Sequence, residues 1–159
     1  MTTRPTSTIT QGERFRIGRD EITLHVTSTA TRGTLLAAVV RIPAGGGPPA
    51  LHRHAAEEVY RLDAGELAIY LGDDAGEVRR VVAGPGSVNH IPGGVAHTIR
   101  NESDSEATAY VVFSPGGDME SFLRAADALA GDGPPAPEDV MALAARHGIE
   151  MAGALPDER

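Results

Sequence analysis

The feature that most restricts the fold is the way glycine and proline divide residues 21–114 into short apolar segments. The segment "EITLHVTS" (21–28) alternates apolar and polar residues, which is typical of a strand with one buried face. Similar segments occur at 34–42, 57–62, 67–72, 78–82, 88–91, 95–101 and 107–114. Short strands at this spacing, separated by turn residues, predict an all-β domain built as an antiparallel sandwich or barrel.

The pattern changes after residue 115. Apolar residues then recur at helical spacing in "MESFLRAADALA" (119–130), where Asp118 is placed to cap the helix. A second helix is predicted over "EDVMALAARH" (138–147), with a glycine directly after it. We therefore expect a flexible N-terminus over 1–12, one β-barrel domain over 13–115, and a short helical C-terminal extension over 116–159 that packs on the barrel.

Composition excludes several classes of function. The net charge is −8 and no dense run of Lys and Arg occurs, so nucleic acid and anionic membranes are not expected partners. The chain has no cysteine, which excludes disulfides, thiolate metal ligands and cysteine nucleophiles. Its first residues lack the apolar run of a secretory signal, and "LLAAVV" (35–40) is too short to span a bilayer. We expect a cytoplasmic protein.

A group of polar residues in "LHRHAAEEVYRL" (51–62) suggests chemistry. Alternate side chains of a strand share a face, so His52 and His54 point the same way. The same register continued through an extended segment adds Glu58 and Tyr60 to that face, whereas the neighbouring acid Glu57 points away. Taken singly, a histidine is more often a surface or hydrogen-bonded residue than a ligand. The spacing alone leaves open a metal site or a polar strand edge.

Two glycine-proline patterns surround these histidines. The first comprises Gly46, His52, His54, Glu58 and Gly65, and the second comprises Gly86, Pro92, Gly94, His97 and Asn101. In their residue types and spacing, the patterns resemble the two signature motifs of the cupin superfamily. The resemblance covers roughly residues 14–115 and implies a double-stranded β-helix, or jelly-roll barrel.

The resemblance also implies one divalent transition metal inside the barrel, held by His52, His54, Glu58 and His97. Three imidazoles and a carboxylate suit Fe, Mn, Ni or Co, and Cu or Zn if the carboxylate moves away. The sequence does not choose among these metals. For Asn101 the family role is structural hydrogen bonding rather than ligation.

The C-terminal segment is similar to that of small bacterial single-domain cupins described as quercetin-dioxygenase-like. This likeness implies a metal-dependent dioxygenase acting on a small enol, enediol or flavonol-like substrate, with Glu58 as the general base. Tyr60 is either a hydrogen-bond donor in the pocket or a core residue. Two alternatives stay open: a non-redox cyclase, isomerase or lyase, and a non-catalytic small-molecule-binding module.

Further positions have two interpretations each. His90 either reaches the pocket or lies on the strand surface. Tyr110 and Phe113 are three positions apart on one strand and therefore face opposite sides, so one of them lines the barrel. Phe113 is therefore a candidate pocket residue. Gly116 and Gly117 either hinge the helices as a lid over the barrel mouth or form a simple capping turn. Cupins of this size usually form homodimers, so we expect a homodimer.

Overall fold

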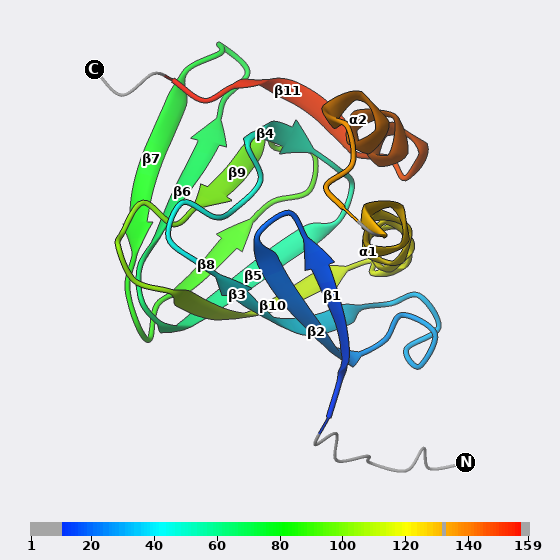
Figure 1. Ribbon diagram of the computed structural model, residues 1–159. Coiled ribbons are helices and arrows are strands. Elements are labelled where there is room, and N and C mark those ends of the chain that lie inside the picture. The colour runs from blue at the N-terminus through cyan, green and yellow to red at the C-terminus, as the bar shows by residue number, and fades with distance from the viewer. Residues whose placement is uncertain (1–10, 132, 157–159) are drawn as a thin grey trace.

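The computed structural model describes residues 11–131 and 133–156, so most of the predicted flexible N-terminus lies outside the described residues. The described chain folds into a two-sheet β structure with two helices on one side (Figure 1). The strands are β1 (Glu13–Ile17), β2 (Asp20–Val26), β3 (Leu36–Ile42), β4 (Ala50–Arg53), β5 (Glu57–Ala64), β6 (Leu67–Gly72), β7 (Val78–Ala83), β8 (Val88–Ile91), β9 (His97–Arg100), β10 (Ala107–Ser114) and β11 (Glu150–Ala154). The helices are α1 (Gly117–Ala130) and α2 (Pro137–Arg146).

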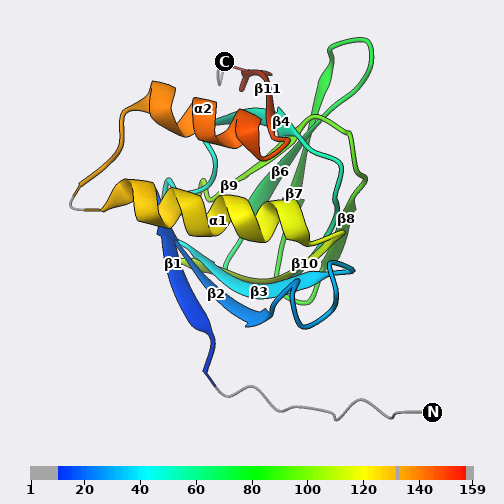
Figure 2. The ribbon, with the colours of Figure 1, turned by 90° about the vertical axis from the view of Figure 1, so that its right-hand side faces the viewer.

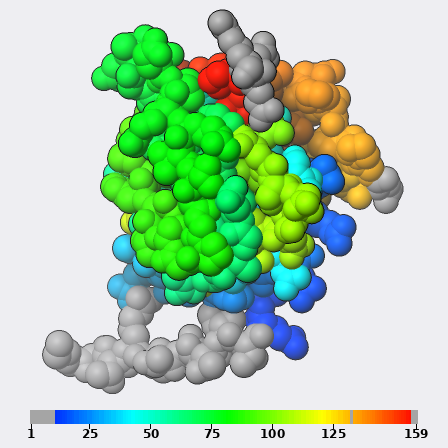
Figure 3. All heavy atoms as spheres, turned by 90° about the vertical axis from the view of Figure 1, so that its left-hand side faces the viewer, coloured from blue at the N-terminus to red at the C-terminus, as the bar shows by residue number. Residues whose placement is uncertain are grey.

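The two antiparallel sheets form a jelly roll, as the sequence predicted. One sheet has the strand order β1-β2-β3-β10-β5-β8, and the other has the order β11-β4-β9-β6-β7. From β3 to β10 the chain passes repeatedly between the sheets, because β4, β6, β7 and β9 belong to one sheet and β5, β8 and β10 to the other. Figure 3 shows the face of the molecule that β6 and β7 cover.

The core lies between the inner faces of the two sheets, and strand β10 shows how the sequence builds it. Its side chains alternate between buried and half-buried, and the inward row is Ala107, Ala109, Val111 and Phe113. β10 pairs with β3 on one side and with β5 on the other, so this row lies at the centre of its sheet. Burial of such apolar surface is the main stabilising contribution in a barrel of this kind.

Glycine is required where β5 turns into β6. Gly65 has a φ of +76°, and a Cβ atom at this position would lie 2.6 Å from the carbonyl oxygen of Glu106 and 2.7 Å from Cα of Ala107. Only glycine avoids both the left-handed strain and the clash with the backbone. The turn therefore brings the β5–β6 connection into direct contact with the start of β10.

The C-terminal extension contains a strand in addition to its two helices. Both predicted helices are present on the same side of the barrel (Figure 2), but β11 then pairs with β4 and extends the second sheet. The prediction of Asp118 as the helix cap is wrong, because α1 begins at Gly117 and Gly116 occupies the capping position without a side-chain hydrogen bond. Within the described residues, neither helix is long and apolar enough to cross a membrane.

Helix α1 is tied to the barrel by polar contacts. Glu120 accepts a hydrogen bond of 2.6 Å from the backbone N–H of Ser28, and Arg124 forms an ion pair of 2.6 Å with Glu13. Together with the β4–β11 pairing, these contacts fix both ends of the extension against the barrel.

Candidate metal centre

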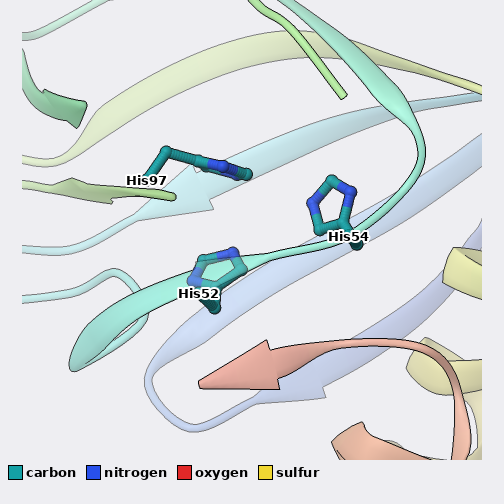
Figure 4. Close-up of side chains that lie close together, drawn as sticks. All are labelled: His52, His54 and His97. Carbon is teal, nitrogen blue, oxygen red and sulfur yellow. The ribbon is translucent and has the colours of Figure 1, made fainter. Parts of the chain in front are cut away.

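Three histidines from two neighbouring strands meet inside the barrel (Figure 4). His52 lies in β4 and is paired directly with His97 in β9, and His54 follows β4 by one residue. One ring nitrogen from each histidine lies within 4.8 Å of those of the other two. This spacing allows the three imidazoles to bind one metal ion.

Backbone carbonyl oxygens orient two of these rings. Nδ1 of His97 lies 2.8 Å from the carbonyl oxygen of Val95, and Nδ1 of His52 lies 3.2 Å from that of Ala50. A carbonyl oxygen only accepts hydrogen bonds, so Nδ1 of each ring carries the proton. The same arrangement is common behind metal-binding histidines, where it fixes the ring and leaves Nε2 facing the metal.

Glu58 reaches the same point from the other sheet. It lies in β5, between Ile91 of β8 and Phe113 of β10, and is 2% exposed. Its Oε1 atom lies 2.5 Å from Nε2 of His54 and 3.2 Å from Nε2 of His97. The structure therefore brings together all four residues that the two sequence motifs singled out.

The buried polar atoms at this point are poorly satisfied within the described chain. Both ring nitrogens of His54 and the Oε2 atom of Glu58 are buried and have no hydrogen-bond partner. The 2.5 Å approach of Glu58 to His54 is close, but its geometry is not that of a hydrogen bond. Unpaired buried polar atoms are costly, and nitrogen and carboxylate ligands converging on one point are what a divalent cation would satisfy. The residues present thus fit a metal ion.

Electrostatics favour the ligand forms of two of these groups. Burial, followed by the nearby His97, lowers the pKa of His52 to about 4, so this imidazole is neutral at physiological pH. Burial opposes ionisation of Glu58, but contacts with His54 and His97 outweigh it and lower the Glu58 pKa to about 2. Burial likewise opposes charge on His97, yet the Glu58 carboxylate raises the pKa of His97. Glu58 is an anion before any metal binds.

Tyr60 and Phe113 lie on the inner side of the barrel, close to the histidines. Tyr60 is buried in the main core, and burial together with the neighbouring Glu58 carboxylate raises its pKa well above the usual value, so the hydroxyl keeps its proton. The ring of Phe113 is 6.4 Å from that of His54. Tyr110 lies on the outer face, where its ring contacts His25.

His90 does not lie with this group. Its side chain is 57% exposed on β8, and its Nε2 atom lies 2.6 Å from Oε2 of Glu57. Both residues occupy the outward positions of adjacent strands, so the pocket role considered for His90 is not supported. Asn101 is fully buried and donates hydrogen bonds to the carbonyl oxygens of Ile42 and Ser105, which agrees with a structural role.

A small cavity of about 80 Å³ opens beside His54. The barrel contributes His54, Ala55 and Ala56 to its wall. The segment from β10 onward contributes Pro115, Asp118, Met119, His147, Gly148 and Ile149. Sequence reasoning did not identify this second group as lining a cavity. Asp118 lies at the start of a predicted helix and His147 at the end of another, and these positions already explained both residues.

The comparisons with known proteins agree with the fold and the motifs. Residues 38–113 match the cupin domain family Cupin_2. The barrel is a cupin domain. Comparison of this cupin with curated protein sequences finds no match.

Solved structures with this fold have diverse functions. Oxalate decarboxylase from Lactobacillus farciminis, in a formate complex, has a TM-score of 0.56 and 24% identity over 65% of this chain and 31% of its own. A sugar phosphate isomerase of the cupin superfamily from Silicibacter pomeroyi has a TM-score of 0.54 and 20% identity over 69% of this chain and 75% of its own. Drosophila melanogaster CENP-C bound to CAL1 has a TM-score of 0.57 and 13% identity over 69% of this chain and 85% of its own.

These identities are below 25%, so the three likenesses show the fold alone. The chain spans about a third of the decarboxylase's length. A cupin fold by itself does not decide the function, which has to be argued from the site.

Proposed function

We propose that this cupin is a metal-dependent enzyme, most consistent with a dioxygenase that acts on a small enolisable molecule. The observation that supports the proposal best is the convergence of three histidines and an ionised, buried carboxylate on one point. Four such groups, two of them incompletely hydrogen-bonded, are costly to assemble for stability alone.

The ligands in this proposal are His52, His54 and His97 with Glu58 as the fourth. A divalent metal held by these residues would supply Lewis acidity toward a substrate oxygen. Four protein ligands suit a five- or six-coordinate ion, which leaves room for substrate. The metals that fit are Fe, Mn, Ni and Co, with Cu and Zn if Glu58 is displaced.

Two side chains have different roles in this site. Glu58 is the nearest proton acceptor, but its pKa of about 2 favours the role of an anionic ligand over that of a strong base. Tyr60 keeps its proton and lies near the Glu58 carboxylate, so we assign it to the wall of the site beside that anion. Phe113 packs near the His54 ring and excludes water from that side.

The cavity argues for a small substrate. A cavity of about 80 Å³ beside His54 suits the smaller members of the class that the sequence suggested, such as an enediol or a hydroxyketone.

Oxygen consumption tests the proposal directly. Metal-free protein is loaded separately with Fe, Mn, Co, Ni, Cu and Zn, and bound metal is counted by elemental analysis. Oxygen uptake is then followed over a panel of small enolisable substrates. We expect uptake with at least one metal in the wild type, none in His54→Ala, and wild-type uptake in the control His90→Ala, whose imidazole lies outside the barrel. Stoichiometric metal without uptake for any metal and substrate would refute the oxidative reaction.

A non-redox isomerase or lyase is the second candidate. The convergence of the same four ligands favours it, because stabilising an enolate needs a polarising metal and no oxidant. Turnover that persists under strict anaerobiosis, and that His54→Ala abolishes, would select this candidate over the dioxygenase.

A further inference from the structure

The C-terminal extension supplies most of the wall of the cavity beside His54. Asp118 and Met119 come from the start of α1, and His147, Gly148 and Ile149 come from the end of α2. Ile149 is buried, and the chain continues directly into β11, which pairs with β4. The buried Ile149 and the pairing of β11 with β4 therefore fix this part of the wall against the barrel.

Asp118 places a negative charge at this wall. A Cβ atom on Gly148 would lie 4.0 Å from Oδ2 of Asp118, so the carboxylate faces the turn that ends α2. None of the described residues lining the cavity is a lysine or an arginine. A divalent metal bound by His54 would attract an anion, but the cavity wall has no cationic side chain to offset the repulsion between that anion and Asp118.

The rest of the wall is largely apolar. Ala55 and Ala56 line the cavity from the barrel, and Met119 and Ile149 line it from the extension. Ile149 is buried and Met119 is half-buried. These side chains are placed to contact the carbon skeleton of a small molecule.

We propose that the C-terminal extension selects the substrate of this site, favouring small uncharged molecules that carry hydroxyl groups and disfavouring dianions. Asp118 accepts hydrogen bonds from substrate hydroxyls and repels carboxylates, His147 provides a second hydrogen-bonding group, and Met119 and Ile149 contact the carbon skeleton. This inference rests on the proposed function, since it assigns a substrate class to the same metal site.

Two probes of equal size separate charge from shape. Oxalate and dihydroxyacetone each have six non-hydrogen atoms, but oxalate carries two negative charges and dihydroxyacetone none. Binding of each probe to anaerobic, Mn(II)-loaded protein is measured by calorimetry and by water-proton relaxation at pH 8, where an ordinary histidine is neutral. Without oxygen, these measurements report binding without oxidative turnover.

The test variant is Asp118→Asn and the matched control is Asp139→Asn. Asp139 lies in the first turn of α2, is exposed, and does not line the cavity, yet its substitution changes the net charge by the same amount. Asp118 is exposed, as Asp139 is, so water screens its charge. We expect Asp118→Asn to tighten oxalate binding by about threefold to fivefold and to change dihydroxyacetone binding by less than about twofold. The control should change neither by more than about twofold. Circular dichroism establishes that both variants fold.

The outcomes distinguish this inference from the proposed function. If the metal-loaded Asp118→Asn protein binds oxalate as the wild type does, or if Asp139→Asn tightens oxalate equally, the inference is wrong and the metal site stands. If the wild type takes up no metal, both the proposed function and the inference that rests on it are wrong.

Discussion

Asn101 provides the sharpest test of how the second motif stabilises the site. Its amide donates hydrogen bonds of 2.8 Å to the carbonyl oxygen of Ile42 and 2.6 Å to that of Ser105. Its side-chain oxygen accepts bonds of 3.0 Å from the N–H and 2.7 Å from the hydroxyl of Ser103. The side chain thereby ties the end of β3 to the loop that follows β9, the strand that carries His97.

The substitution Asn101→Ala removes all of these bonds at a fully buried position. A neutral hydrogen bond contributes about 1 kcal/mol net, and groups left unpaired add to the loss, so we expect the free energy of unfolding to fall by about 3 kcal/mol. For a chain of this length that corresponds to a decrease in Tm of roughly 9 °C. Urea denaturation of the metal-free protein, followed by circular dichroism, measures it.

Asn89→Ala is the matched control. Asn89 is half-buried and donates one hydrogen bond of 3.1 Å to the hydroxyl of Ser87, so its loss should cost less than about 1 kcal/mol. A cost for Asn101→Ala no larger than that of the control would refute the structural role. Folded Asn101→Ala should also bind metal stoichiometrically, and a folded variant without metal would contradict a role that is confined to stability.

Three further predictions concern the metal, one histidine and one turn. Metal at a hundred times its Kd should stabilise the wild type by about 2.7 kcal/mol, or roughly 8 °C in Tm, and a His54→Ala variant that shows the same shift in a thermal scan would contradict the site. The His52 pKa of about 4 lies below the usual value, so in metal-free protein its imidazole NMR signals should not titrate between pH 5.5 and 8; a midpoint near 6.5 would be inconsistent with its burial. Gly65→Ala should cost at least about 3 kcal/mol of unfolding free energy, whereas Gly76→Ala, also at positive φ but with no atom within 4 Å of the added Cβ, should cost about 1 kcal/mol; equal costs would show that the backbone contact is unimportant.

The strand pattern was predictable where both ends of a strand are marked by turn residues. β6, β8 and β10 have the bounds that alternation and the flanking turns indicated. β1 was missed because "ERFRI" is rich in charged residues, and its pairing with β2 supplies the stability that its own pattern does not indicate.

Strand parity also selected Glu58 over Glu57 correctly, although the chain bends between them and the histidines. His54 to Ala56 is not a strand, and β4 and β5 belong to different sheets. The parity argument still holds because the inner faces of the two sheets are opposed, so an inward residue of β4 and an inward residue of β5 meet across the interior.

Neither β11 nor the wall of the cavity could be predicted from local sequence. β11 reads "EMAGA", with no alternation and a glycine at 153, and it forms only because β4 offers a free edge far away in the sequence. Asp118 and His147 come together only through the packing of α1 and α2 on the barrel. Such positions depend on contacts between residues far apart in the sequence, and the local spacing of apolar residues does not indicate these contacts.

The pairing of β11 with β4 has a consequence for the order of folding. Until β11 docks, β4 presents an unpaired edge beside His52, and β11 follows every other described element in the chain. Non-local pairings of this kind form slowly, so a nascent or refolding chain spends time with its metal-binding strand open to other chains. Partially folded molecules should therefore associate through β4 more readily than fully folded ones, and β11 protects the edge of the metal-binding strand against aggregation.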